Sequence, residues 1–543
     1  MDGRRVAYLG RRGCTTVDFE RFLANPPAFV AVDIETVSLK DKRVVGIGMS
    51  GDGQDAWYVP FLPEISPYAT DALIRVVDNP NITKIYHNCL FDLPALLPFG
   101  ADTSRINDTL ILCYLTGMLP GLKEAAKVCL GMEIAEISDV LPKGKSMLDL
   151  PYEVVADKCC RDVQATWRLH MYLVEHVDAK YAEREMKLVP MLIRMSQRGI
   201  RLDQERRGEL EIKYAREARY YKDIAEAQGF NPGSPQQVGY ILAQNGNFLP
   251  FKRHKSGRTN WQALDTSESV LRTVDDPMAA IVLNYRSVSK LLSTYLVPWR
   301  GVERAHTRFH LGTATGRLAS TDRNLQNIPP GEIRSIFLPD GKVFTDFDYS
   351  QQELRTLAYV SQDREMLDIY EQGKDIHQET ADFLGIARKV AKNTNFAMVY
   401  GATPETIMET AGIQSRAMAM RLMNTWANKF PQAFNWIKDT QEFGVRHRKV
   451  QTLGGRWLYL PMPYEEDEKE VVRKAVNYPI QGSAAELTKE AMLRLDGLDP
   501  VLQVHDEMLM EGQVEKSELL ARGLEWVGPF HTPIELKYLE RWQ

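Results

Sequence analysis

The segment Lys342–Arg355 reads KVFTDFDYSQQELR, and the rest of the sequence can be organised around it. Its first nine residues, with their aromatic and β-branched side chains, predict a strand that ends near Asp348. A second acid, Asp506, lies in the apolar segment VLQVHDEMLMEG (Val501–Gly512), which predicts a hairpin with Asp506 at its turn. A carboxylate among apolar strand residues is costly to bury unless it is paired or bound to a metal ion. Asp348 and Asp506 are therefore candidate metal ligands, although acids in turns more often face water.

The segment between these two strands that carries the most chemistry is RKVAKNTNFAMVYG, residues Arg388–Gly401. Arg388, Lys392, Phe396 and Tyr400 recur every four residues, so a helix would place them along one slowly drifting face. Two cations suit a polyphosphate, and two aromatic rings suit a stacked base. The alternative is a half-buried helix with solvated basic ends.

A separate set of carboxylates lies near the N-terminus. Asp33 and Glu35 stand at i and i+2 of the predicted strand Phe29–Glu35, so both side chains share one face of it. Asp92 follows the predicted strand Ile82–Asn88, and Asp162 lies in a helical stretch. Four such carboxylates could hold two divalent cations, which stabilise both oxygens of an in-line phosphoryl displacement. Taken alone, Asp-x-Glu is more often a strand end that faces water.

Length and composition are those of a globular protein of two to four domains. The 543 residues include 67 Lys and Arg and 72 Asp and Glu, with 44% hydrophobic and 26% charged residues. We expect neither a signal peptide nor a membrane span, and the six cysteines are expected to be reduced thiols. Residues 191–300 are nevertheless basic, with 17 Lys and Arg against 11 Asp and Glu. The run Lys252-Arg253-His254-Lys255 predicts a basic loop tip, which is either a phosphate-backbone contact or an ordinary solvated loop.

Hydrophobic periodicity divides the chain into two parts, 1–185 and 186–543. Residues 29–100 predict a mixed sheet covered by helices, and residues 151–198 predict helices that contain the boundary without a flexible linker. Two glycine patterns are expected to be decoys. Gly46-x-Gly48-x-x-Gly51 precedes a predicted strand rather than the helix that a dinucleotide site requires, and Gly144-Lys145-Ser146 is expected to be a plain loop.

Together these segments resemble, in order, the motifs of family A DNA polymerases, the group of bacterial DNA polymerase I. The polymerase motifs are DFDYSQQELR (346–355), RKVAKNTNFAMVYG (388–401), VHDE (504–507), TATGRLASTDRNLQNIP (313–329) and Arg473-x-x-x-Asn477-x-x-x-Gln481. VAVDIET, HNCLFD and CCRD are similar to the three motifs of the family's 3′-5′ exonuclease. The resemblance implies an α/β and α+β multidomain fold, with a ribonuclease H-like exonuclease domain (1–185) before a right-hand polymerase domain (186–543). It also implies a thumb at 186–305, a palm at 306–363 and 449–543, and fingers at 364–448.

The resemblance implies roles for individual residues. Those implied for catalysis and metal binding at the polymerase site are Asp348, Asp506, Glu507 and the Tyr349 carbonyl. Those implied to bind the deoxynucleoside triphosphate are Arg388, Lys392, Phe396, Tyr400, His377, Gln351 and Glu353, the last filling the space of a 2′-hydroxyl. Those expected to contact primer–template DNA are Arg317, Asn327, Arg473, Asn477, Gln481, His505, Lys252, Arg253 and Lys255. The implied exonuclease metal ligands are Asp33, Glu35, Asp92 and Asp162.

The chain departs from the family pattern at three positions. Gln352 replaces an isoleucine and Ala397 replaces a glycine, and we expect both changes to be tolerated. Lys158 stands where the third exonuclease motif has a tyrosine, four residues before Asp162. Three outcomes are open for this lysine: it turns to solvent, it pairs with Asp162 and weakens metal binding, or it loses its proton and acts as a base.

The expected activity is template-directed DNA synthesis with proofreading of uncertain strength, using two Mg²⁺ ions per site that Mn²⁺ can replace. The alternatives are a polymerase with an inactive exonuclease domain, a single-subunit RNA polymerase and a catalytically idle nucleic-acid-binding protein. We expect a monomer, without the 5′-nuclease domain of bacterial polymerase I, in the cytoplasm of a bacterium or a virus-infected one. An organellar origin stays open, and a processivity partner stays unknown.

Overall fold

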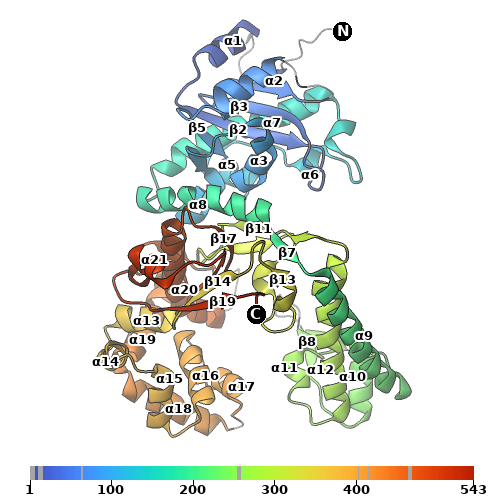
Figure 1. The fold of residues 1–543 in the computed structure, drawn as a ribbon, viewed down its shortest axis with the longest axis vertical. Helices are drawn as coiled ribbons and strands as arrows, with labels where there is room; N and C mark the ends of the chain where they lie inside the picture. The colour runs from blue at the N-terminus through green and yellow to red at the C-terminus, as the bar shows by residue number, and fades with distance from the viewer. Residues whose placement is uncertain are drawn as a thin grey trace.

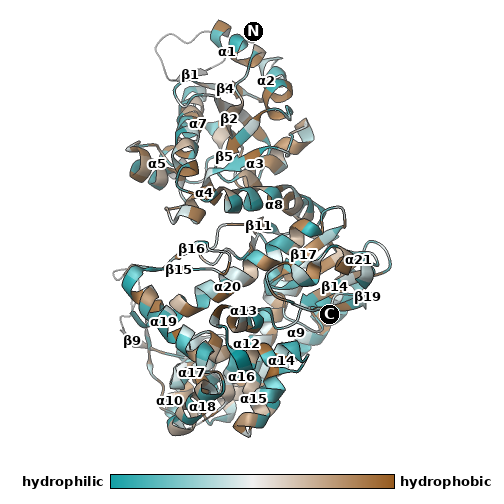
Figure 2. Ribbon diagram, turned by 90° about the vertical axis from the view of Figure 1, so that its left-hand side faces the viewer, coloured by the Kyte–Doolittle hydropathy of each residue, from teal (hydrophilic) through white to brown (hydrophobic). Residues whose placement is uncertain are grey.

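The computed structural model describes residues 7–9, 16–62, 65, 67–253, 259–401, 403–413, 415–462 and 468–543. The N-terminal domain stands above a larger C-terminal part, from which two helical arms extend downward (Figure 1). Seen after a 90° turn, the two parts meet at one long helix, α8 (Figure 2). Among the described residues, no helix is both long enough and apolar enough to cross a bilayer. The five cysteines described are unpaired, and Cys14 lies outside the described residues.

A six-stranded mixed sheet forms the centre of the N-terminal domain, as the strand pattern predicted. Its order is β1-β4-β3-β2-β5-β6, in which β2 runs antiparallel to β3 and parallel to β5. The strands are β1 (Ala7–Leu9), β2 (Phe29–Thr36), β3 (Val44–Ser50), β4 (Ala56–Pro60), β5 (Thr83–Tyr86) and β6 (Ile106–Asp108). The helices are α1 (Thr16–Ala24), α2 (Pro67–Ala72), α3 (Cys89–Leu96), α4 (Thr109–Thr116), α5 (Leu122–Leu130), α6 (Ile137–Val140) and α7 (Tyr152–Val174).

Two glycines of the first decoy, Gly46 and Gly48, lie in a strand pair, as predicted, and Gly51 follows the end of β3. β3 pairs antiparallel with β4, and a Cβ atom added at Gly46 would lie 2.2 Å from the Tyr58 hydroxyl. One added at Gly48 would lie 2.6 Å from Sγ of Cys159 on α7. These glycines therefore allow close packing of the sheet against its neighbours. Gly144 lies in a turn, as expected of a loop, but Ser146 caps a three-residue 3-10 helix, Met147–Asp149.

Helix α8 (Ala179–Arg198) contains the predicted domain boundary and continues into the C-terminal part. It contacts α3 and α4 above and α20 below, so the junction is packed rather than linked by a flexible segment. After it, β7 (Ile200–Leu202) pairs with β10 (Arg304–Ala305) and β13 (Phe337–Leu338). This small sheet closes the base of the first arm.

The first arm consists of helices with one small hairpin. The helices are α9 (Gln204–Ala227), α10 (Pro235–Gln244), α11 (Glu268–Leu271) and α12 (Pro277–Lys290). The hairpin strands are β8 (Phe251–Arg253) and β9 (Thr259–Leu264), which the mainly helical prediction for this region missed. Phe230, Val238, Leu242 and Val282 form a core separate from that of the central sheet.

The central sheet has the order β17-β18-β14-β19, and all of its neighbouring strands are antiparallel. Its strands are β14 (Phe344–Tyr349), β17 (Pro500–Val504), β18 (Glu507–Glu511) and β19 (Ile534–Leu539). Helices α13 (Gln352–Ser361), α20 (Glu468–Arg494) and α21 (Lys516–Ala521) pack around it. Short strands β11 (Arg308–His310) and β12 (Ala319–Thr321) form a pair near α8. The predicted strand at 342–350 and the predicted hairpin at 501–512 are both confirmed.

The second arm is helical, as predicted. Its helices are α14 (Arg364–Glu371), α15 (Ile376–Leu384), α16 (Arg388–Val399), α17 (Pro404–Ala411), α18 (Arg416–Lys429) and α19 (Pro431–His447). Strands β15 (Lys449–Gln451) and β16 (Trp457–Tyr459) form a hairpin beyond α19. Buried residues such as Met366, Trp426 and Phe430 form the core of this arm, which also includes Leu354 and Leu357 of α13. Helix α16 therefore faces the end of the central sheet, and the core of the second arm holds it in place.

Candidate active sites

A cavity of about 510 Å³ lies where the central sheet meets the second arm. It gathers most of the residues that the sequence assigns to nucleotide and metal binding. Those that line it are Arg317, Asp348, Tyr349, Gln351, Glu353, His377, Arg388, Lys392, Phe396, Tyr400, His505 and Asp506. They come from the turn before β12, the end of β14, the turn after β17, the start of α13 and one face of α15 and α16.

The two predicted metal ligands of this cavity come from neighbouring strand ends. Asp348 is opposite Glu507 in the β14–β18 register, which brings it beside Asp506 in the hairpin turn. Although part of Asp348 is exposed, the surrounding cavity walls desolvate its carboxylate, and this desolvation, followed by repulsion from Asp506, raises its pKa to about 7. Burial likewise raises the pKa of Asp506 to about 6. Both carboxylates are therefore harder to ionise than usual, and a bound divalent cation would stabilise their ionised forms.

Glu507, which was predicted to be catalytic, does not line this cavity. Both of its carboxylate oxygens lie 3.0 Å from Nη1 of Arg334, and Oε1 accepts a hydrogen bond from Nε1 of Trp542. A carboxylate engaged in this way can influence Asp348 through its charge, but its oxygens are already used. The prediction overlooked Arg334 and Trp542, because they are distant from Glu507 in sequence.

Another acid of the cavity, Glu353, joins two neighbouring elements. It forms an ion pair with Arg317, and the Tyr400 hydroxyl donates a 2.5 Å hydrogen bond to its Oε2. Burial and the nearby Glu353 charge raise the pKa of Tyr400, so this phenol stays a donor. Glu353 therefore holds the end of α16 against α13 and narrows the cavity between them.

The basic and aromatic face of α16 points into the cavity. At its N-terminus, Arg388 pairs with Asp375 at 2.6 Å. The ring of Phe396 lies 5.8 Å from that of His377, measured between centroids. Burial lowers the pKa of His377 to about 4, so its imidazole is neutral. Its Nδ1 accepts from the Asn395 amide, which leaves the proton on Nε2.

Asn395 illustrates a positioning residue that sequence reasoning missed. It is 1% exposed, and its Oδ1 accepts a hydrogen bond from Nε1 of Trp426 while its amide donates to His377. This buried chain fixes the imidazole tautomer from the interior of the second arm. Nothing in the local sequence sets this asparagine apart, because at i+7 from Arg388 it falls close to the basic side of the helix.

Two of the predicted DNA contacts, Arg317 and His505, line the cavity, whereas the other described ones lie outside it. Arg473, Asn477 and Gln481 follow one another along α20, where Arg473 is exposed and pairs with Glu470. Asn327 is exposed, and its carbonyl accepts from the Tyr295 hydroxyl. Lys252 is exposed on β8; Arg253 ends that strand, and Lys255 lies outside the described residues.

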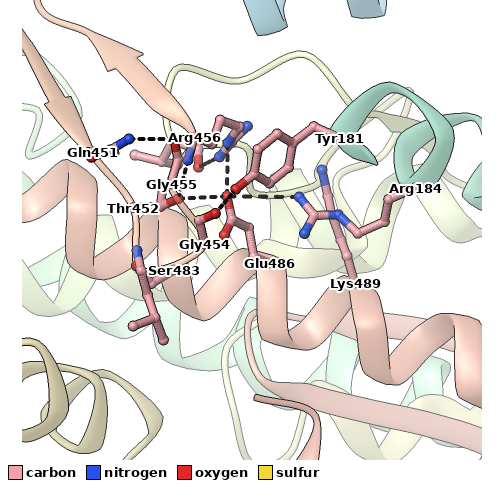
Figure 3. A network of polar contacts seen from close by, with 12 residues as sticks. Tyr181, Arg184, Gln451, Thr452, Gly454, Gly455, Arg456, Ser483, Glu486 and Lys489 are labelled. Atoms are coloured by element: carbon pink, nitrogen blue, oxygen red, sulfur yellow. Dashed lines mark hydrogen bonds and ion pairs between the residues drawn. The ribbon is translucent and has the colours of Figure 1, made fainter. Parts of the chain in front are cut away.

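A buried polar network connects α8 with the floor of the cavity (Figure 3). Lys489 of α20 lines the cavity and forms an ion pair with Glu185 of α8; both side chains are at most 3% exposed. One turn earlier, Glu486 accepts hydrogen bonds from Thr452 at 2.9 Å and Arg456 at 3.1 Å. Helix α8 also contributes Tyr181, whose hydroxyl donates to the Gly454 carbonyl.

The same network reaches the turn that carries Arg317. Nη2 of Arg456 donates to the Thr315 carbonyl at 2.7 Å. A Cβ atom added at Gly316 would lie 2.3 Å from the same Nη2 atom. Gly316 has φ of +81°, a conformation that glycine adopts without strain. The sequence offered no sign that Arg456 and Glu486 meet, because they are 30 residues apart and belong to different elements.

The carboxylates of the N-terminal site also come together. Asp33 and Glu35 project from β2, Asp92 from α3, and Asp162 from α7. Ligand atoms of Asp33, Glu35 and Cys159 lie within 4.8 Å of one another. Burial and repulsion from Glu35 raise the pKa of Asp33 to about 8, and burial followed by the Asp33 charge raises that of Asp92. The carboxylate oxygens of these four acids are hard ligands, which suit Mg²⁺ or Mn²⁺.

Lys158 occupies this second site and does not turn to solvent. Its Nζ lies 2.8 Å from Oε1 of Glu35 and 2.7 Å from Oδ2 of Asp162. Burial acts to lower the pKa of Lys158, but the attraction of Glu35 and Asp162 outweighs it and leaves the pKa well above its usual value. The structure therefore shows the paired lysine and contradicts the solvent-facing alternative, and the raised pKa favours the protonated form over the base.

Comparison with known proteins adds the family. Residues 202–527 match the family described as DNA polymerase family A, and residues 15–178 match the family described as 3′-5′ exonuclease. DNA polymerase I of Chloroflexus aurantiacus is 33% identical over 94% of this chain and 60% of its own length. The Pseudomonas aeruginosa enzyme is 30% identical over 91% of this chain, and thermostable DNA polymerase I of Thermus aquaticus is 34% identical over 66%.

Among solved structures, the fold is similar to the POL domain of Pol1 from M. smegmatis in complex with DNA primer-template and dNTP. The TM-score is 0.81 at 22% identity, and the match covers 98% of both chains. This chain spans about 60% of the length of the first two curated relatives. An exonuclease domain followed by a polymerase domain is thus confirmed as the fold class. With more than half of its length matched by the polymerase family, the chain belongs to DNA polymerase family A.

Proposed function

We propose that this chain extends a DNA primer along a template, using deoxynucleoside triphosphates. The observation that carries the proposal is the single cavity in which Asp348 and Asp506 face the cations and rings of α16. Membership of the DNA polymerase family, rather than of an RNA polymerase family, favours deoxynucleotides as substrates. The arms and central sheet then act as thumb (186–305), fingers (364–448) and palm (306–363 and 449–543).

The cavity suggests how each group acts. Arg388 and Lys392 would hold the triphosphate, His377 would donate from Nε2 to it, and Phe396 would stack on the sugar and base. Gln351 lines the same wall at the start of α13, and Tyr400 would close the pocket beside the templating base. Glu353 would occupy the space of a ribose 2′-hydroxyl.

Asp348 and Asp506, with the Tyr349 carbonyl, would hold two Mg²⁺ ions, or Mn²⁺ in their place. Their raised pKa values fit this role, since bound cations would stabilise both carboxylates in the ionised form. The ions would supply charge stabilisation for attack by the primer 3′-hydroxyl and departure of pyrophosphate. The chain's own contribution is to aim both carboxylates at one point of the cavity.

Primer–template DNA would lie across the face that includes α20 and the turn before Arg317. Arg473, Asn477, Gln481, Asn327 and His505 would contact it near the primer end, and the basic segment 252–255 would contact it farther away. We further propose that the chain acts as a monomer in a bacterial cytoplasm.

The N-terminal domain would remove mismatched 3′-terminal nucleotides at Asp33, Glu35, Asp92 and Asp162. Its match to the exonuclease family and the meeting of these four acids support this activity. The Lys158 ion pairs favour slow excision, because they engage oxygens that metal ions need.

Primer extension tests the polymerase function. Purified chain is mixed with a labelled primer–template and either deoxynucleotides or ribonucleotides, with Mg²⁺, beside an Asp506→Asn control. We expect extension with deoxynucleotides that the control lacks. Preference for ribonucleotides would favour the RNA polymerase alternative, and no extension with retained DNA binding would favour an idle binding protein. Loss of the 3′-terminal nucleotide without added nucleotides, compared with Asp33→Ala, tests the exonuclease.

A further inference from the structure

The four carboxylates of the exonuclease site are not equivalent, because a lysine bridges two of them. Lys158 contacts Glu35 and Asp162 at 2.8 and 2.7 Å. Within the described chain, neither Asp33 nor Asp92 forms an ion pair with it. Asp92 instead accepts a backbone hydrogen bond from Ile34, next to Asp33. Among the described residues, one half of the site is therefore paired with a cation, and the other half forms no ion pair.

Packing of α7 keeps the lysine in this place. Cys159, the next residue, is fully buried, and its Sγ would lie only 2.6 Å from a Cβ atom added at Gly48. Sγ of Cys159 also lies 3.4 Å from Oδ2 of Asp33. The side chains of Lys158, Glu35 and Asp162 are 11%, 5% and 11% exposed, so water reaches the ion pairs poorly. The ammonium is thus part of the site's built structure rather than a mobile surface charge.

We propose that the Lys158 ammonium takes the place of one of the two divalent cations expected at this site. The chain then holds one divalent ion there, on Asp33 and Asp92. This proposal rests on the proposed exonuclease function and specifies its metal requirement.

Two physical effects exclude the second ion. The ammonium donates hydrogen bonds to one oxygen of Glu35 and one of Asp162, so a metal ion bridging these residues would have to displace it. Its positive charge also repels a dication at short range, in a site where few waters screen the interaction. When all four carboxylates are ionised, they and the ammonium carry a net charge of −3, which one dication reduces to −1.

Manganese-binding stoichiometry tests the proposal without relying on activity. The full chain carrying Asp348→Asn and Asp506→Asn serves as the background, so that the polymerase site does not bind ions tightly. Titration with Mn²⁺, followed by calorimetry and by the electron paramagnetic resonance signal of free Mn²⁺, counts the bound ions. We expect one ion in this background and two after Lys158→Met. The second ion should bind at least about 100-fold more weakly when the lysine is present.

Matched variants separate charge from shape. Lys158→Arg keeps the positive charge and should leave the count at one, whereas Lys158→Gln removes it and should agree with Lys158→Met. Asp33→Asn should abolish the remaining site. Circular dichroism and thermal melting with and without Mn²⁺ identify any variant that fails to fold, and Lys158→Gln then replaces Lys158→Met.

Each other count contradicts the proposal. Two ions with the lysine present, one ion both with and without it, or no ion in the background would each overturn it. Failure of the exonuclease function itself looks different: 3′ excision by wild type and Asp33→Ala would be equal, whatever the ion count.

Discussion

At the scale of single residues, the ionised carboxylates of Asp348 and Asp506 lower the free energy of unfolding because they lie close together in the cavity. Their pKa values of about 7 and 6 exceed that of an unfolded aspartate, so the folded chain binds more protons than the unfolded chain between about pH 4 and pH 7. Stability contributed by this uptake is present below pH 4 and is lost as the pH rises through 7.

Asp348→Asn should therefore be more stable than wild type at pH 8 without metal ions, by on the order of 1 kcal/mol after allowing for solvent screening. The difference should vanish near pH 4, and extension activity should fall by more than about 100-fold. Thermal melting in a chelator at both pH values measures the first effect. A variant that melts at or below the wild-type temperature at pH 8 would contradict the proposed repulsion.

The size and the charge of the Glu353 side chain can be tested separately for their effect on the choice between deoxynucleotides and ribonucleotides. Glu353→Ala should raise ribonucleotide use, because removing the side chain opens the space of the 2′-hydroxyl. Glu353→Gln keeps the shape and the hydrogen bond from Tyr400 but loses the ion pair with Arg317. The ratio of kcat/KM for a deoxynucleotide to that for its ribonucleotide should fall at least about tenfold in the alanine variant and change little in the glutamine variant. Equal ratios in all three proteins would remove Glu353 as the sugar gate.

At the scale of elements, α8 and α20 are joined by a charge pair that is almost completely buried. Breaking such a pair leaves one charge unpaired and costs about 3–5 kcal/mol, whereas replacing both partners by apolar residues is close to neutral. Burial, only partly offset by Glu185, already lowers the pKa of Lys489 to about 8. The pair therefore restricts how α8 and α20 can pack more than it stabilises them.

Glu185→Leu should lower the melting temperature of the polymerase part, and adding Lys489→Met should restore most of the loss. Thermal unfolding of the single and double variants gives the coupling between the two residues. Because Lys489 lines the cavity, Lys489→Met should also change the KM for nucleotide. Additive effects of the two substitutions would show that the contact is energetically unimportant.

At the scale of the whole molecule, the two candidate sites lie on two parts that meet at α8 and share one continuous hydrophobic core. The two sites share no residue. The carboxylates of one project from β2, α3 and α7, and those of the other lie at the end of β14 and in the β17–β18 turn. The two activities should therefore be lost independently.

We expect Asp33→Ala to leave the extension rate within about twofold of wild type while abolishing 3′ excision. Asp506→Asn should do the reverse. Single-turnover rates of both reactions, measured on the same preparation, test this. Loss of both activities in either variant would mean that the sites depend on each other through α8.

The sequence by itself determined the order of the elements and most members of both sites. Asp33 and Glu35 share a face because strands have a period of two, and the face of Arg388, Lys392, Phe396 and Tyr400 follows from the helical period. Such patterns depend on neighbours a few residues away, and the structure places all six residues as their spacing implied.

Only the tertiary structure decided which charges meet. Glu507 pairs with Arg334, Lys158 bridges Glu35 and Asp162, and Glu185 pairs with Lys489 across 304 residues of chain. A sequence shows that these residues are charged, but not whether they are buried or which partner lies within 4 Å. Burial makes an unpaired charge costly, so the packing of α7 and α8 against their neighbours selects the partners, and that packing involves the whole chain.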